Sequence, residues 1–280
     1  MDALQDKQTK QSVTQTCADC GAETSGKFCS SCGQETHLHR SLSHLGHELL
    51  HGVAHFDGRF WRTLPLLWIN PGKLTREWVQ GRRTRYVQPL ALFLCTLFVL
   101  FMALTFTSSK PNDAEPVREE SVRALQQELF IDIGGGENHP IMKTIQKKLN
   151  NPEFAVYKVE QTIYKFSFLI LPFSIPCMWL LFFWRRDIYL YDHSVFVLYS
   201  LTFITMLTII LFWTQSIHIL GQMLFYVALI LIPIHMFAQL RGAYSLSIIG
   251  ALWRTVLLLI FCSIVMVLFI LTVIYLGLGH

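Results

Sequence analysis

The chain has 280 residues, of which 52% are hydrophobic and only 15% charged, and its mean hydropathy is +0.40. This composition excludes an ordinary soluble globular protein and favours a membrane protein. The formal net charge of +4 is concentrated in one segment. Between Arg59 and Arg85 the sequence has seven Lys or Arg residues and a single acidic residue, Glu77. Such a local excess predicts a basic patch beside a bilayer, with no general affinity for nucleic acid.

Residues 1–16 are polar and contain no apolar stretch. We therefore expect a disordered tail with no cleavable signal peptide, and an N-terminus that stays in the cytosol.

Two Cys-x-x-Cys-Gly turns follow within residues 17–34. Each turn directs two thiolates to one point, and Gly21 and Gly33 permit the tight backbone that follows. Together the turns predict a small zinc ribbon with a structural Zn²⁺, and free dithiols or disulfides are the alternative. Four thiolates would close the coordination shell, so this metal would fold the head and catalyse nothing. The ligands would be Cys17, Cys20, Cys29 and Cys32.

Residues 41–88 are predicted to form cytosolic juxtamembrane amphipathic helices. In the first of them a row of histidines faces away from a row of leucines, and the row contains an HExxH string. In zinc peptidases the two histidines of this string bind a metal and the glutamate activates its water. No third ligand is evident, which favours a solvated polar face. A second metal site at His47 and His51, with Glu48 as a catalytic base, is the alternative. The full row is His44, His47, His51 and His55.

A second helix is expected over residues 59–69, bent at Pro65, with aromatic residues at the lipid headgroup level. A partner-docking role is the alternative for this helix. Asn70-Pro71-Gly72 should end it, with Gly72 permitting the turn, and a short helix over 73–80 should then reach Gly81. Four arginines precede the next apolar run and predict that this side faces the cytosol: Arg76, Arg82, Arg83 and Arg85.

The remaining chain predicts an all-α integral membrane domain with five transmembrane helices. The polar segment 108–162 has seven basic and nine acidic residues, so the positive-inside bias does not hold it in the cytosol and we expect it outside. Pro172 and Pro176 predict kinks in the second span, which either help packing or free carbonyl groups along a path. The predicted spans are 89–107, 163–184, 194–213, 217–239 and 255–278, with the C-terminus in the periplasm.

Ionisable residues gather near the cytosolic ends of these spans. Each alone is explained as an interfacial anchor. As a set they could form a cytosolic-face pocket for a lipid headgroup, an anionic solute or a proton relay. The residues of this predicted pocket are Arg82, Arg83, Arg85, Tyr86, Asp192, His193, His235 and Arg241.

Several motifs resemble one known family. They are the cysteine-rich head, Arg62-Thr63-Leu64, Asn70-Pro71-Gly72, the run from Gly81 to Pro89, and Tyr191-Asp192-His193 followed by Phe196. Together they resemble a bacterial family of polytopic membrane proteins of unknown function, domain-of-unknown-function family 3667, over nearly the whole chain. Asp192 stands where that family is expected to have Glu more often. The resemblance implies a bacterial inner-membrane protein, supplies no activity, and does not include the HExxH string.

The leading prediction is therefore a non-enzymatic inner-membrane protein that binds a protein partner or anionic lipid, or assists transport. A membrane metallopeptidase using Glu48 and a small-solute transporter built on the kinked second span are the alternatives. Membrane lipids are expected partners, nucleic acid is not, and the sequence leaves the oligomeric state open.

Overall fold

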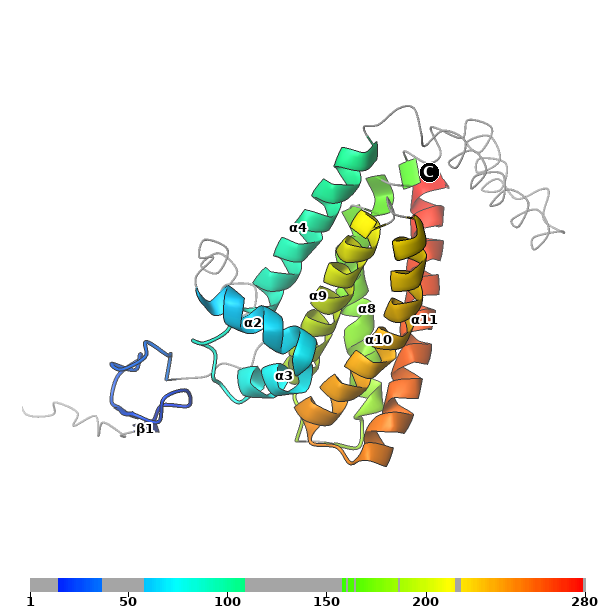
Figure 1. Ribbon diagram of the computed structural model, residues 1–280. Coiled ribbons are helices and arrows are strands. Elements are labelled where there is room, and N and C mark those ends of the chain that lie inside the picture. Colours follow the sequence, from blue (N-terminus) through cyan, green and yellow to red (C-terminus); the bar gives the residue numbers. More distant parts are fainter. Residues whose placement is uncertain are drawn as a thin grey trace, which may run out of the picture.

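The computed structural model describes residues 15–36, 58–108, 158–159, 161–163, 165–185, 187–214 and 218–278. The histidine row, Glu48, most of the predicted extracytoplasmic segment and residues 1–14 lie outside the described residues. The described chain consists of a small N-terminal head, two short helices and a bundle of longer helices (Figure 1).

The head, residues 15–36, is built from two equivalent turns. Gly21 N–H donates to the Cys17 carbonyl at 3.0 Å, and Gly33 N–H donates to the Cys29 carbonyl at 2.9 Å. Gly21 and Gly33 have φ of 77° and 74°, so both need the left-handed conformation that glycine adopts without strain. Strand β1 (Gln15–Thr16) pairs antiparallel with β2 (Glu23–Thr24), so the folded head begins two residues before the first cysteine.

Helices α2 (Gly58–Ile69) and α3 (Pro71–Val79) follow the predicted segments closely. The Asn70 side chain caps α3 by accepting the Lys73 N–H at 3.1 Å, and Pro71 occupies the first turn, where no donor is needed. Gly81, at φ 99°, lies just beyond the end of α3. The expected role of Gly72 was wrong, because this residue lies within α3 and packs directly against Gly242.

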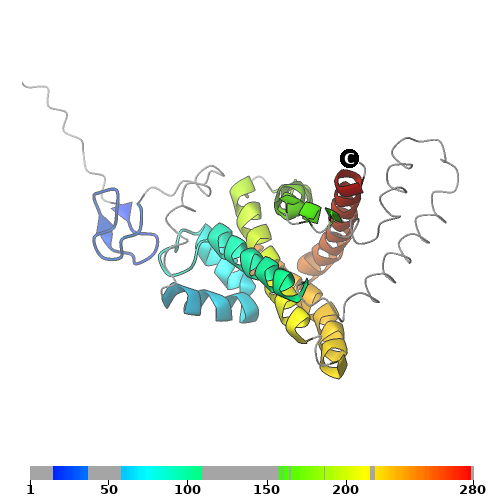
Figure 2. The same cartoon turned by 90° about the horizontal axis from the view of Figure 1, so that it is seen from above.

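The bundle contains α4 (Pro89–Ser108), α8 (Ile170–Leu181), α9 (Leu190–Thr214), α10 (His218–Tyr244) and α11 (Ile248–Leu278). These helices stand side by side and alternate in direction along the chain (Figure 1). Seen from above, α2 and α3 lie beside α4 on one side of the bundle, and α8 and α11 lie on the other (Figure 2). Helix α9 is central, and an unbroken run of its residues from Tyr191 to Ser200 is buried.

Three described helices are long and apolar enough to cross a membrane: Leu190–Thr214, Leu220–Tyr244 and Ile248–Leu276. Two shorter apolar helices accompany them, Pro89–Thr105 and Ile170–Leu181. In the second predicted span, α-helical residues at 163 and 165–166 are followed by the 3₁₀ turn η1 (Ser167–Leu169), and α8 continues from Ile170. Pro172 then lies in the first turn of α8, where a missing backbone donor costs little, and only Pro176 lies deeper in the helix.

Candidate functional site

The four cysteines of the head come together as the sequence predicts. Their sulfur atoms all lie within 4.8 Å of one another, with Cys17–Cys32 and Cys20–Cys29 each at 3.5 Å. In a tetrahedron with metal–sulfur bonds of about 2.3 Å, the sulfurs are about 3.8 Å apart. All four cysteines are free thiols rather than disulfides. The arrangement therefore fits a metal ion held by four thiolates.

The backbone of the second turn lowers the pKa of one of these cysteines. N–H groups of Cys32 and Ser31 point at the Cys29 sulfur and lower the pKa of its thiol to about 7. A thiol with that pKa is partly thiolate near neutral pH, which is the form that binds metals. Burial instead raises the pKa of Cys32 to about 12, and a cation would have to displace that proton.

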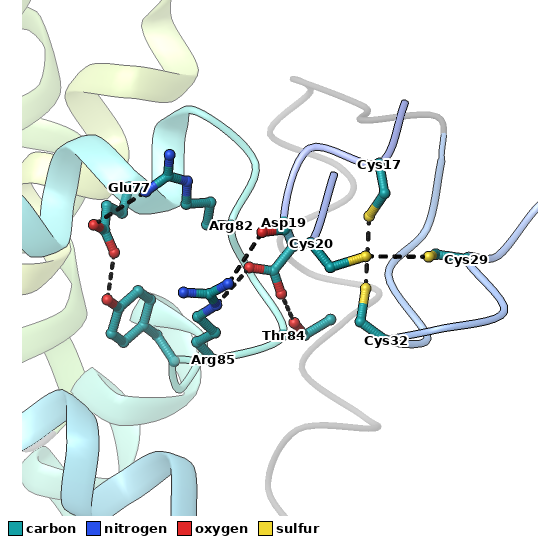
Figure 3. Close-up of polar contacts among 10 residues, drawn as sticks. Cys17, Asp19, Cys20, Cys29, Cys32, Glu77, Arg82, Thr84 and Arg85 are labelled. Carbon is teal, nitrogen blue, oxygen red and sulfur yellow. Dashed lines mark hydrogen bonds and ion pairs between the residues drawn. The ribbon is translucent and has the colours of Figure 1, made fainter. Parts of the chain in front are cut away.

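The head is attached to the rest of the protein by a residue inside its first cysteine turn (Figure 3). The carboxylate of Asp19, between Cys17 and Cys20, lies 2.7 Å from Nε of Arg85 and accepts a hydrogen bond from Thr84. Arg85 also donates to the Asp19 carbonyl oxygen at 3.1 Å. The Asp19 side chain is only 2% exposed, so the contact is shielded from solvent on the side of the head. One turn of the chain therefore carries both metal ligands and the docking carboxylate.

Residues 80–88, which we call the neck, connect α3 to α4 and receive the head. Glu77 accepts a hydrogen bond from the Tyr86 hydroxyl and forms an ion pair with Arg82 at 3.4 Å (Figure 3). Thr63 in α2 accepts the Val87 N–H at 2.9 Å. Burial, then the Glu77 hydrogen bond, raise the pKa of Tyr86 to about 12. The neck is thus a structured element with its own polar contacts.

The neck and α3 continue this network into the bundle. Trp78 Nε1 donates to the Tyr191 hydroxyl at 3.1 Å, and the Arg83 guanidinium lies over both rings, at 5.9 Å from Trp78 and 5.2 Å from Tyr191. Tyr199 donates to the Val87 carbonyl at 3.2 Å. The arginines of the neck therefore all contact other groups of the protein, and Arg82 and Arg85 keep 43% and 48% of their side chains exposed.

Helices α2 and α3 are joined to α10 by buried contacts. His235 Nε2 lies 2.9 Å from the Leu67 carbonyl, and its ring stacks on Phe203 at 3.6 Å between centroids. Gln239 is fully buried and donates to Thr75 Oγ1 at 3.2 Å and to the Phe196 carbonyl at 3.1 Å, while its Oε1 accepts from Ser200 at 2.8 Å. These residues hold the helices together.

The other predicted pocket residues are distributed over separate places. His193 Nδ1 lies 2.9 Å from the Tyr244 hydroxyl in a buried aromatic cluster. Asp192 is the third residue of α9, and its carboxylate accepts a hydrogen bond from the Tyr189 N–H at 3.1 Å. An acidic side chain at this position caps the start of the helix. This cap explains why a glutamate would serve there as well. Arg241 is exposed at the end of α10. Of the eight predicted residues, Asp192 lines a cavity between α3, α9 and α10.

Sequence reasoning missed the contacts of Asp19 with Thr84 and of Glu77 with the neck. The sequence carried one signal for Asp19: it is a carboxylate between two cysteines, in a chain whose residues 59–85 hold an excess of arginines. Arg76 was noted only as a marker of topology, yet it lines a cavity between α3, α9 and α10 together with Arg185.

One family model matches the chain, "Protein of unknown function (DUF3667)", over residues 57–101. This confirms the resemblance over the segment that holds α2, α3, the neck and the first half of α4, including Arg62-Thr63-Leu64, Asn70-Pro71-Gly72 and the run from Gly81 to Pro89. The cysteine head and the Tyr191-Asp192-His193 motif lie outside the match. No curated protein and no solved structure matches the chain.

Proposed function

We propose that this is a non-enzymatic protein of the bacterial inner membrane whose zinc ribbon serves as a docking head for a protein partner in the cytosol. The observation that carries the proposal is the contact of Asp19 with Arg85 and Thr84, which fixes the head to the neck through the same turn that provides Cys17 and Cys20. Zinc is the metal of choice because a closed four-thiolate site suits it, and such a site folds its domain without catalysis.

The alternating helices support five membrane spans with a cytosolic N-terminus. Three helices have the length and hydropathy of spans, and α4 and α8 are shorter apolar helices that pack against α9. Several helix ends meet at one end of the bundle, and three arginines lie close to them: Arg76, Arg185 and Arg241. The positive-inside rule expects such residues on the cytosolic side.

The second cysteine turn offers a surface for a partner. Phe28, directly before Cys29, is 64% exposed although its neighbours in the head are mostly small or polar. An exposed aromatic side chain held beside a rigid metal site is the kind of anchor that protein interfaces use. The head is also held at a fixed place on the neck, which reduces the entropy lost on binding.

The proposal is tested by placing a photo-crosslinking amino acid at Phe28 in living cells. We expect a discrete crosslinked protein, its loss with the additional Cys29→Ser substitution, and its absence with the crosslinker at exposed Glu23. Metal analysis of the purified protein should give one zinc per chain, and none in the Cys29→Ser variant. A substrate turnover that depends on Glu48 or His193, or equal crosslinking at Phe28 and Glu23, would contradict the proposal.

A further inference from the structure

A polar cavity of about 210 Å³ lies between α3, the turn before α9 and the end of α10. It is separate from the cysteine site, and it adjoins the neck at Gln80. Its charged lining consists of two guanidinium groups and two carboxylates, and Thr75 and Ser245 add hydroxyl groups. The charged residues are Arg76, Arg185, Asp187 and Asp192.

Arg76 projects from the last turn of α3 into this region. Its Nε is buried and has no hydrogen-bond partner within the part of the chain that the structure describes. A buried guanidinium N–H without an acceptor costs free energy, and charged donors are the most costly to leave unsatisfied. An acceptor supplied by a ligand would remove this cost.

Arg185 lies on the opposite wall of the cavity. It is fixed by Asp187, whose carboxylate oxygens lie 3.3 Å from Nε and 2.7 Å from Nη2, and its Nη1 donates to the Tyr244 carbonyl at 3.3 Å. Asp192 is held by the Tyr189 N–H. The two fixed carboxylates balance the two guanidinium groups, so a ligand with a single negative charge would meet repulsion as well as attraction.

The surroundings of the cavity indicate the level of the lipid headgroups. The turn before α9 exposes Trp184 (80%) and Tyr189 (56%), and the start of α11 exposes Ile249 (80%). Exposed Trp and Tyr at the ends of apolar helices are typical of the membrane–water interface. Val79, Ile188 and Ala243 give the cavity an apolar part as well.

We propose that this cavity binds a phosphate ester that also carries an ammonium group, as the phosphoethanolamine headgroup does. The phosphate oxygens would accept hydrogen bonds from Arg76 and Arg185, and the ammonium group would donate to Asp187 and Asp192. Each charge in the lining then has a partner of opposite sign, and Nε of Arg76 gains an acceptor. The ligand is a lipid headgroup or its free soluble counterpart. This inference goes beyond the proposed function and does not depend on it.

The test is native mass spectrometry of the full chain in detergent, titrated with phosphatidylethanolamine or phosphatidylglycerol. We expect one tightly bound phosphatidylethanolamine per chain and about tenfold weaker binding to the Arg76→Gln variant, since one charge-assisted hydrogen bond is lost. Arg241→Gln is the matched control, because Arg241 is an exposed arginine on α10 that does not line the cavity. Asp187→Asn, at an exposed side chain, should weaken phosphatidylethanolamine more than phosphatidylglycerol.

Ala243→Leu fills the cavity without changing a charge and keeps the test decisive if Arg76→Gln fails to fold. Equal weakening by Arg76→Gln and Arg241→Gln, or unchanged binding to Ala243→Leu, would overturn the site. Equal affinity for the two lipids would overturn the assignment of an ammonium-bearing ligand. Competition by soluble phosphoethanolamine with the same dependence on Arg76 would support the site and identify the soluble source, whereas lipid binding without such competition would support the site and identify the lipid.

Discussion

The segment from α2 to the neck is attached to its two neighbours in different ways. Towards the bundle its contacts are buried and closely packed: a Cβ on Gly72 would lie 2.4 Å from the Gly242 Cα, and fully buried Gln239 bonds Thr75. Towards the head its contacts are a few polar ones, centred on Asp19 and a half-exposed Arg85. The difference indicates that α2 and α3 are packed into the helical bundle, whereas the head is held by a few polar contacts that we expect metal binding to control.

The largest effect is expected where α3 crosses α10. Gly72→Val places a side chain against the backbone of Gly242 and against the Ala238 carbonyl, 2.8 Å from the new Cβ, so α3 must move away from the bundle. Overpacking of this kind costs about 2 kcal/mol or more. Thermal unfolding in detergent should show a clearly lowered midpoint or no folded protein.

The control for this crossing is Gly58→Ala at the start of α2, where nothing lies within 4 Å of an added Cβ. It should unfold within a degree or two of the wild type, on the order of 0.5 kcal/mol or less. Equal destabilisation by the two substitutions would show that α3 does not pack against α10 as described.

The next effect concerns the buried amide of α10. Gln239→Leu removes the donor to Thr75 and the acceptor for Ser200, at a cost of about 1 kcal/mol for each lost hydrogen bond. Both hydroxyl groups keep their hydrogen bonds to the Pro71 and Phe196 carbonyls. A double-mutant cycle with Thr75→Val, measured by denaturant unfolding, should reveal a coupling of about 1 kcal/mol. Strictly additive effects would argue against this hydrogen bond.

A smaller effect is expected at the attachment of the head. Asp19→Asn removes the charge that pairs with Arg85 but no thiolate, so zinc content should stay at that of the wild type while the head detaches more readily, by on the order of 1 kcal/mol. Limited proteolysis between head and neck would report the detachment. Lys27→Ala, at an exposed residue of the head, is the control and should leave proteolysis unchanged.

The smallest effect is a pH dependence within the neck. The pKa of Tyr86 is raised above its ordinary value of 10 to about 12, by burial first and then by Glu77. The protonated hydroxyl therefore stabilises the neck fully below pH 10, and this stabilisation is lost as pH rises through 12. The tyrosinate absorbance of the wild type, compared with Tyr86→Phe, should contain one high-pH step that the variant lacks. A Tyr86 step at pH 10 would contradict the burial described for this hydroxyl.

The helices of this protein could be predicted from sequence because hydropathy and the Asn70-Pro71-Gly72 signal act locally. The cysteine cluster was equally accessible, since two Cys-x-x-Cys-Gly turns define their own geometry. The 3₁₀ turn at residues 167–169, which interrupts the helical residues of the second predicted span just before Pro172, had no such signal.

Contacts between residues far apart in the sequence could not be predicted. His235 and Arg83 were assigned to one pocket because both are polar and near span ends, yet His235 bonds the Leu67 carbonyl and Arg83 covers the rings of Trp78 and Tyr191. A single sequence shows where a residue lies along a helix, but it does not show which residue of another helix it contacts. The close approach of Gly72 to Gly242 has no local signal at all.

Metal bound by the four cysteines is expected to fix the head on the neck through Asp19. The direct test is amide hydrogen exchange of residues 80–88 in the zinc-loaded protein and after chelation. We predict that chelation accelerates exchange in the wild type, and that Asp19→Asn exchanges at the faster rate even when loaded with zinc. Identical exchange in the zinc-loaded and the chelated wild-type protein would show that bound metal does not fix the head on the neck.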